Sequence, residues 1–343
     1  MGKVHKIIGL FMVTFIAFTV CGCAREEKEL QSEQVQIGMA FDSFVIERWQ
    51  RDKKTFIDTA ANAGAEVIVQ NANGDVEKQI EQVRYLMEKK VDAIVIIPVD
   101  AEKITDVIQE AKAEGIIIIA YDRMIKNADA DLYISFDNES VGRMMGEAMV
   151  EAGIVNKNVL MLGGPESDSN VAVVEAAFQK IMEESNNRIV ASIHCTNWKA
   201  EDASSYIYEN ENIVEAVDAI MCGNDNIASK VMYALTEKRL AGKVAVTGQD
   251  ADVEACQRIV EGTQIVTIYK SVDTLASTAA ECTLKLINDQ ELENTSYIND
   301  GTYEIPYIAL EPVSVTKNNL DEVIIESGFH SREDVYLNLP STN

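Results

Sequence analysis

Short apolar segments alternate with amphipathic segments from residue 35 almost to the end of the chain, and this alternation constrains the fold more than any other feature. The apolar segments are six to eight residues long and nearly continuous, while the segments between them carry apolar residues at helical spacing. Such strands, separated by helices, are typical of a parallel sheet that is covered on both faces. The strands predicted in the first half are 35–41, 65–70, 91–98, 116–121 and 132–138.

A second series of the same kind follows. Its length is similar to that of the first series, so the sequence predicts two lobes of the same architecture. No low-complexity tract separates them, which indicates that several segments of chain, and not one flexible linker, join the lobes. The predicted strands are 158–164, 189–195, 218–224, 243–249 and 265–270, and the predicted helices are 46–64, 74–90, 101–115, 139–152, 169–185, 200–210, 225–239, 251–260, 272–288 and one near 318–327.

The net charge argues against a nucleic-acid-binding function. The 343 residues carry a formal charge of −26 at pH 7 and show no basic stripe, so nucleic acid would be repelled. With 47% hydrophobic residues, the chain is long and apolar enough to bury a sizeable core.

The first 34 residues are expected to lie outside the fold. Lys3, His5 and Lys6 precede an apolar stretch at 7–20, which ends in small residues and Cys23. This pattern is typical of a bacterial lipoprotein leader, so we predict a signal peptide at 1–22 and lipidation of Cys23. An uncleaved signal anchor is the alternative. Residues 23–34 are charged and aperiodic and are expected to form a tether.

The remaining cysteines are predicted to be buried thiols and not disulfides. Their spacing is not that of a disulfide framework, and they lie at the ends or inside of apolar segments. Metal binding is not expected, because the three histidines are scattered and no HExxH motif is present. These cysteines are Cys195, Cys222, Cys256 and Cys282.

Polar side chains follow the carboxyl end of nearly every predicted strand. The isoleucine run 116–119, for example, leads to the charged residues Asp122 and Arg123. Ligands of open parallel sheets bind beyond the carboxyl ends of the strands, so these side chains are expected to line a cleft. A single Asp or Asn at such a position is more often a helix N-cap, and Asp168 and Asn224 suit that role. The full set is Arg48, Trp49, Asp122, Arg123, Asp168, Asn170, Asn197, Trp198, Asn224, Asp225, Gln249, Asp250 and Lys270.

The chemistry of this set suits a sugar. Charged and amide side chains offer fixed donors and acceptors, and a hydrogen bond to a charged group contributes about 1.5–3 kcal/mol. The only two tryptophans, Trp49 and Trp198, offer flat apolar faces to C–H groups. A glycosidase is disfavoured, because its acid needs a raised pKa in an apolar setting, whereas Asp122, Asp168 and Asp250 have cationic or amide neighbours.

Several longer motifs resemble those of one protein family. Together they resemble those of the D-xylose-binding proteins of bacterial sugar ABC importers, within the ribose/galactose-type periplasmic-binding superfamily. The resemblance covers nearly the whole chain from residue 35. The motifs are IGMAFDSFVIERWQRD (37–52), QNANG (70–74), AYDRMI (120–125), YISFDNESVG (133–142), TGQDAD (247–252), VTIYK (266–270) and SGFH (327–330).

The resemblance implies an α/β fold of the type I periplasmic-binding class. Two similar Rossmann-like parallel-sheet lobes would be joined by a three-segment hinge and close around one sugar. The expected N-terminal lobe comprises 35–136 and 270–300, and the expected C-terminal lobe comprises 137–269 and 301–343.

The resemblance also implies a set of sugar-binding residues. Trp49 and Trp198 are the expected facing aromatics, with Phe44 as the alternative to Trp49. The other residues implied are Arg48, Asp122, Arg123, Asp168, Asn170, Asn224, Asp250 and Lys270.

Two roles remain open for such a protein. It resembles importer components that present the sugar to ABC permease subunits, and it also resembles membrane-tethered sensors that signal to a two-component histidine kinase. Either role places it on the extracytoplasmic face of the membrane, held there by lipid, with no cofactor and no enzymatic activity. A sugar-responsive repressor would share the lobes, but it would need a basic helix-turn-helix where this chain has its leader.

Overall fold

The computed structural model describes residues 34–339, which belong to one compact unit of the chain. The leader, the lipidation site Cys23 and most of the expected tether lie outside the described residues. Within 34–339, no helix is both long and apolar enough to cross a membrane.

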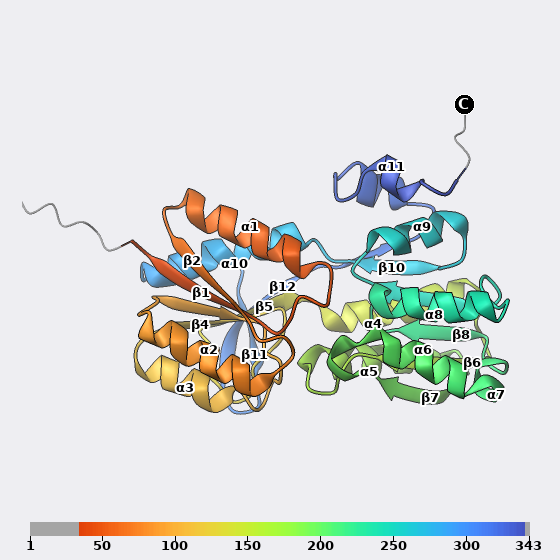
Figure 1. Ribbon diagram of the computed structural model, residues 1–343, viewed down its shortest axis with the longest axis horizontal. Helices are drawn as coiled ribbons and strands as arrows, with labels where there is room; N and C mark the ends of the chain where they lie inside the picture. Colours follow the sequence, from red (N-terminus) through yellow and green to blue (C-terminus); the bar gives the residue numbers. More distant parts are fainter. Residues whose placement is uncertain (1–33, 340–343) are drawn as a thin grey trace, which may run out of the picture. The chain divides into compact units, whose positions relative to one another are not determined.

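The first lobe is built on a seven-stranded sheet with the order β11-β12-β5-β4-β3-β1-β2 (Figure 1). All neighbouring strands pair in parallel except β11 and β12, which form an antiparallel edge hairpin. The strands are β1 (Gln36–Phe41), β2 (Glu66–Asn71), β3 (Ala93–Ile96), β4 (Ile117–Tyr121), β5 (Leu132–Phe136), β11 (Ser296–Asn299) and β12 (Glu304–Leu310).

The second lobe is built on a six-stranded sheet with the order β13-β10-β9-β8-β6-β7. Here too only the edge strand, β13, is antiparallel. Two mixed, mainly parallel sheets with helices on their faces confirm the predicted fold class. The strands are β6 (Asn158–Gly163), β7 (Arg188–His194), β8 (Ala219–Cys222), β9 (Ala245–Gln249), β10 (Val266–Tyr269) and β13 (Val313–Val315).

Helices cover both faces of each sheet, as near-continuous apolar strands require. In the first lobe, α1 (Trp49–Asn62) and α10 (Val272–Ile287) pack on one face, and α2 (Val76–Glu88) and α3 (Thr105–Ala113) pack on the other (Figure 1). Local signals set the ends of these helices. The Asp75 carboxylate, for example, accepts hydrogen bonds from the backbone amides of Glu77 and Lys78 in the first turn of α2.

The second sheet is covered in the same way. α4 (Asn138–Glu151) and α5 (Ser169–Glu184) pack on one face, and α6 (Ala200–Glu209) and α8 (Asp225–Glu237) pack on the other. α9 (Val253–Glu261) ends at Gly262, which has φ +82°, a left-handed conformation that glycine adopts without strain. The short helices are α7 (Glu211–Val214), a 3₁₀ turn (Thr196–Trp198), a π-helical turn (Asp321–Ile325) and α11 (Arg332–Val335).

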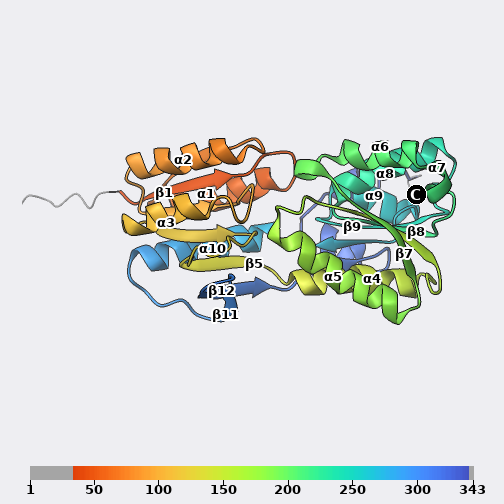
Figure 2. The same ribbon diagram turned by 90° about the horizontal axis from the view of Figure 1, so that it is seen from below.

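The chain passes between the two sheets three times. The first crossing follows β5, the second follows β10, and the third joins β12 to β13 through Glu311 and Pro312. The predicted boundary at residue 300 is therefore wrong for 301–310, because β12 pairs with β5 in the first sheet (Figure 2). The apolar stretch 304–315 looks like one segment in the sequence, but Pro312 lacks an N–H and separates two strands that belong to different sheets.

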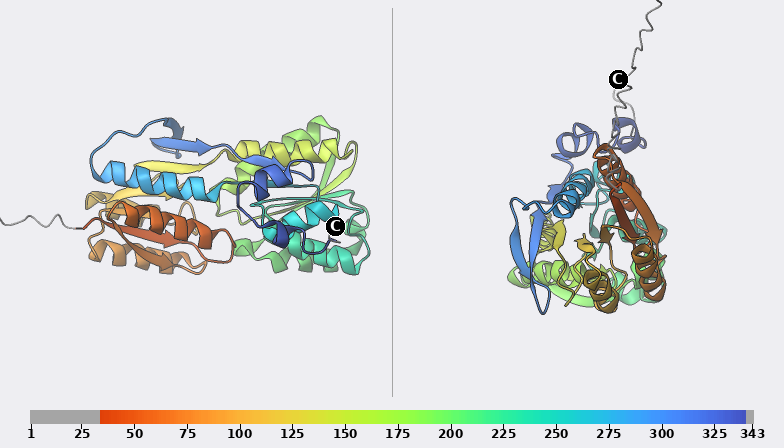
Figure 3. Two further views of the ribbon diagram at one scale, coloured as in Figure 1. Left: turned by 90° about the horizontal axis from the view of Figure 1, so that it is seen from above. Right: turned by 90° about the vertical axis from the view of Figure 1, so that its left-hand side faces the viewer.

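The last part of the chain packs on the second lobe. Phe329 and Val335 join a cluster with Cys256 and Ile259 of α9, and α11 lies beside α9 (Figure 3). The helix predicted near 318–327 is a π-helical turn over Asp321–Ile325.

All four cysteines of the described region are buried and free, which confirms the prediction of buried thiols. Burial raises the pKa of Cys195 to about 12, so its thiol remains protonated and unreactive at neutral pH.

Candidate functional site

One cavity between the two lobes is lined by all ten predicted sugar-binding residues. It lies beyond the carboxyl ends of the strands, where a parallel sheet offers polar loop residues. Phe44, the alternative to Trp49, is not among the described residues that line it. Its ring packs 4.9 Å from that of Phe41. The ten residues are Arg48, Trp49, Asp122, Arg123, Asp168, Asn170, Trp198, Asn224, Asp250 and Lys270.

In the first lobe, Arg48 organises a buried ion-pair network. It precedes α1, and its guanidinium lies 3.0 Å from Asp52 one turn later and 3.0 Å from Asp122 at the end of β4. Tyr121 donates its hydroxyl proton to the same Asp52 carboxylate. Burial opposes the charge on Arg48, yet these carboxylates raise its pKa well above the usual value. Arg48 is therefore held as a fixed cation at the wall of the cavity.

Arg123 forms a second ion-pair network that reaches across the lobes. It lies 2.8 Å from Asp42 after β1 and 2.6 Å from Asp168 of the second lobe. All three side chains are almost completely buried, and the Arg123–Asp168 contact exists only while both lobes are together. Asp122 and Arg123, which follow β4, therefore each meet an opposite charge.

In the second lobe, two ligand candidates are also helix caps. Asp168 accepts from the amide of Asn170 at the start of α5, and Asn224 accepts from the amide of Ile227 at the start of α8. Asp168 also accepts from the indole N–H of Trp198 at 3.1 Å. The capping role anticipated for these residues is confirmed, and it coexists with a position on the cavity wall.

The remaining pair joins the two lobes at the hinge. Lys270, at the second crossing, lies 2.7 Å from Asp250, and Asp250 lies 3.9 Å from Arg48 of the first lobe. Asp122, Asp250 and Trp198 have φ values of +64°, +96° and +58°. Non-glycine residues in this left-handed region are strained and cluster at functional sites.

The carboxylates of the cavity differ in their electrostatic balance. Burial would raise the pKa of Asp122, but Arg48, Lys270 and Arg123 together lower it below the ordinary value. For Asp168 and Asp42, burial prevails and raises the pKa, although Arg123 opposes it in both. Asp122 is therefore the carboxylate best held in its ionised form.

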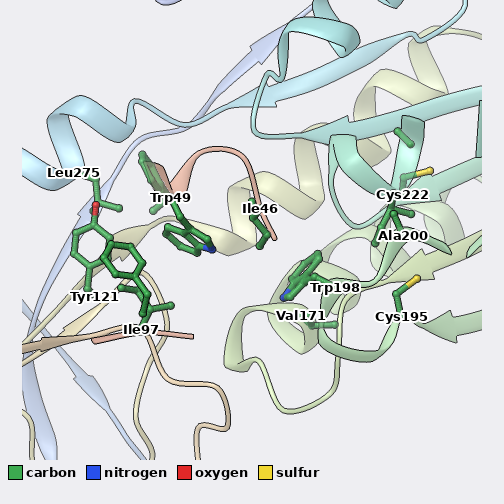
Figure 4. Packing of buried hydrophobic residues seen from close by; sticks show 14 of the residues in the cluster. Ile46, Trp49, Ile97, Tyr121, Val171, Cys195, Trp198, Ala200, Cys222 and Leu275 are labelled. Atoms are coloured by element: carbon green, nitrogen blue, oxygen red, sulfur yellow. The ribbon is translucent and has the colours of Figure 1, made fainter. Parts of the chain in front are cut away.

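Two glycines let aromatic and acidic side chains lie against the backbone. A Cβ at Gly164 would sit 2.3 Å from the Trp198 ring, and one at Gly163 would sit 2.0 Å from Glu175 Oε1. Figure 4 shows Trp198 and Trp49 within one cluster, with Ile46 and Val171 beside them. The second lobe thus presents an indole that only glycine at position 164 admits.

Several buried polar atoms at the cavity have no hydrogen-bond partner within the described chain. Two are donors from the first lobe, Trp49 Nε1 and Arg123 Nη2, and two come from the second, Asn224 Nδ2 and Gln249 Oε1. Buried polar groups are almost always paired, so these atoms indicate a polar ligand. No group of acidic, histidine or cysteine side chains in residues 34–339 could hold a metal ion.

Some lining residues are absent from the set that the resemblance implies. The position of Gln249 at the end of β9 is a sequence signal for a lining residue, and so is that of Asn138 just after β5. Asp42 holds Arg123 in place and directly follows β1, so the strand-end rule applies to it as it does to Asp122. Others, such as Glu175 on α5, have no signal in the sequence beyond helical periodicity.

Further contacts hold the lobes together at the rim. The backbone amide of Ala101 donates to Ser167 O, and that of Met124 donates to Ser169 Oγ. Asn170 donates from its side chain to Asp122 O at 3.0 Å. The structure is therefore a closed form, in which the cavity is covered from both sides.

Comparison with known proteins places this architecture in a family. Residues 37–291 match the family model described as a periplasmic binding protein domain. The chain is 37% identical to the D-xylose-binding periplasmic protein of Haemophilus influenzae, over 96% of this chain and 99% of that one. It is 38% identical to the D-xylose-binding periplasmic protein of Escherichia coli, over 89% and 93% of the two chains.

A solved structure of a solute-binding protein is also similar to this chain. A carbohydrate transporter solute-binding protein from Chloroflexus aurantiacus, in complex with D-glucose, superposes with a TM-score of 0.80 at 26% identity, covering 88% of this chain and 98% of that one. These matches confirm the resemblance predicted from the sequence motifs. The chain belongs to the family of periplasmic binding proteins.

Proposed function

We propose that this protein binds D-xylose in the cavity between its lobes and presents it to the permease of an ABC importer. Membership in a family of solute-binding proteins bears out the prediction that it is not an enzyme. The names of the two relatives at 37% and 38% identity support xylose as the ligand.

The observation that carries the proposal is the set of unpartnered polar atoms on the cavity wall. Two donors from the first lobe, together with a donor and an acceptor from the second, lie buried at one cavity. A pentose carries hydroxyl groups around its ring, each of which is both donor and acceptor. Such a ligand would satisfy atoms of both lobes at the same time, whereas an apolar ligand would leave them unpaired at about 1–3 kcal/mol each.

The lining residues would make different kinds of contact with the sugar. Arg48, Asp122 and Arg123 are held by ion pairs and offer hydroxyl groups a rigid set of partners. Trp49 and Trp198 present indole surfaces to the C–H faces of the sugar ring. Asp250 and Lys270 complete the set at the hinge side.

Closure of the lobes is the mechanism that we infer. The sugar touches both lobes only when they are together, so it binds the closed form more tightly and shifts the population toward it. The rim contacts and the Arg123–Asp168 pair form in the same step. The permease would then recognise the closed form.

Calorimetric titration of the mature protein with a panel of sugars tests the ligand. We expect D-xylose to bind more tightly than D-ribose, D-arabinose, D-glucose and D-allose, with one site per chain, and to be recovered unchanged. Tighter binding of a hexose, or no binding of any sugar in the panel, would refute xylose as the ligand.

A lipid anchor at Cys23 is the second part of the proposal. A lipidated N-terminal cysteine, followed by the charged segment 24–34, would hold the binding unit at the extracytoplasmic face. We expect Cys23→Ala to move the protein from the membrane fraction to the soluble fraction, with sugar affinity unchanged. Retention of the variant in the membrane would favour an uncleaved signal anchor.

Crosslinking on intact cells separates the importer from the sensor. With xylose present, we expect the main adduct to contain ABC permease subunits. A xylose-dependent adduct with a histidine kinase in their place would establish the sensor role.

A further inference from the structure

Another carboxylate, that of Asp225, lies behind the cavity wall and is not among the residues that line the cavity. It is the first residue of α8, directly after the cap Asn224, and it is fully buried. A Cβ at Gly248 of β9 would sit 2.1 Å from its Oδ1, so the fold makes room for the carboxylate by placing glycine there.

Three donors converge on this carboxylate. Gln264 Nε2 donates to Oδ1 at 2.8 Å, and Thr267 Oγ1 and the backbone amide of Asp252 donate to Oδ2 at 2.5 and 3.2 Å. Two of these donors are themselves oriented by further hydrogen bonds. Arg258 donates to Gln264 Oε1, and the backbone amide of Ala251 donates to Thr267 Oγ1. Every partner therefore offers a hydrogen, and only an ionised Asp225 accepts all three.

The contacts hold the segment that carries Asp250 into the sugar cavity. Asp250 and Ala251 have φ values of +96° and +54°, a strained conformation that needs support from outside. Asp225 supports the next residue, Asp252, and through Thr267 it supports Ala251. On the other side of the segment, His330 donates to Ala251 O at 2.7 Å.

We propose that Asp225 is a positioning residue for sugar binding, which in its ionised form holds segment 250–252 so that Asp250 meets the sugar, and which releases that segment when it is protonated. This inference rests on the proposed function, because it concerns the affinity of the same cavity. A proton on Oδ2 would face the hydrogen of the Asp252 amide or would force the Thr267 hydroxyl to turn from donor to acceptor, and a proton on Oδ1 would displace the Gln264 amide.

The surroundings of Asp225 bring its titration into the physiological range. Burial raises its pKa to about 7, against the opposing effect of Arg258 and the hydrogen bonds from Thr267 and Gln264. The ionisable groups that face it are Arg258 and Cys256 on α9, Asp252 before α9, Asp250 after β9 and Cys222 at the end of β8.

The segment that Asp225 supports borders a second cavity on its other side. This cavity is lined by Asp252, Glu47 and His330. Glu47 is exposed and Asp252 is half-buried. Burial also raises the pKa of Asp252 well above its usual value, and the Asp225 and Asp250 carboxylates add to this effect.

The test measures xylose affinity from pH 5.5 to 8.5 for the wild type, Asp225→Asn and Asp252→Asn. For one group with a pKa near 7, wild-type affinity at pH 6 should be about tenfold weaker than at pH 8. Asp225→Asn should be weak and independent of pH. Asp252→Asn keeps its backbone amide and should keep the slope. A flat wild-type profile, an unchanged slope in Asp225→Asn, or a flat Asp252→Asn profile would overturn the proposal.

Amide hydrogen exchange gives a second readout that needs no sugar. In the free protein, protection of the peptide that contains Ala251 and Asp252, corrected for intrinsic exchange, should fall as pH drops through 7. Equal protection at pH 6 and pH 8 would overturn the proposal even where Asp225→Asn fails to fold. Absence of sugar binding at every pH, with the expected exchange profile, would refute the proposed function alone.

Discussion

The cationic side chains of the first lobe reach the cavity already paired within their own lobe, whereas several polar side chains of the second lobe reach it as parts of helix caps. Arg48 binds Asp52 and Asp122, and Arg123 binds Asp42. In the second lobe, Asp168 and Asn224 each use one oxygen to start a helix. The first half of the site is therefore rigid without the second, and we infer that the sugar docks on the first lobe before closure recruits the second.

The substitution with the largest expected effect disrupts the ion-pair network of the first lobe. Arg48→Met leaves the buried carboxylates Asp52 and Asp122 without their main cation, so unfolding should become easier by about 3–5 kcal/mol and xylose binding should be lost. Denaturant unfolding and calorimetry measure the two effects. Lys54→Met removes an exposed pair with Asp58 on the same helix and is the matched control, which should leave both quantities unchanged. Stable, sugar-binding Arg48→Met protein would show that the first lobe is not the prebuilt half.

The next effect tests the pair that joins the lobes. Arg123→Ala and Asp168→Ala should each weaken xylose binding by at least about 1.5 kcal/mol, because each removes the buried charged contact that joins the lobes. Their effects should not add, so a double-mutant cycle should give a coupling energy of comparable size. Additive effects would mean that the contact across the lobes does not contribute to closure.

A smaller effect separates capping from ligand binding in the second lobe. Asn224→Ser keeps a good N-cap for α8 but removes the unpartnered Nδ2 donor. We expect stability within about 0.5 kcal/mol of wild type and xylose affinity weaker by roughly 0.5–1.5 kcal/mol. Asp75→Ser at the exposed cap of α2 is the control for capping alone and should leave affinity unchanged. Unchanged affinity in Asn224→Ser would leave this residue with a structural role only.

The sequence predicted the two lobes and the ten lining residues because both depend on local signals. Strand ends and apolar runs are visible within a few residues, and a parallel sheet collects all its carboxyl ends at one edge. The assignment of β12 to the first sheet was missed, because its pairing with β5 joins Tyr307 to Tyr133 over a long sequence separation. Which partner neutralises each charge, such as Asp42 for Arg123, likewise depends on packing between distant segments.

The smallest expected effects concern the two tryptophans, one in each lobe. Trp49 is almost fully buried, and the Arg48 guanidinium lies 4.5 Å from its ring centroid, so its environment is set before the sugar arrives. Trp198 belongs to the second lobe, and we expect it to contact the sugar only on closure. Because these are the only tryptophans in the chain, Trp49→Phe and Trp198→Phe each leave one fluorescent reporter. We expect xylose to change the emission of Trp198 more than that of Trp49, and each substitution to weaken binding by about 0.5–1.5 kcal/mol. A larger change at Trp49 would mean that the first lobe rearranges around the sugar, and the order of docking inferred above would then be reversed.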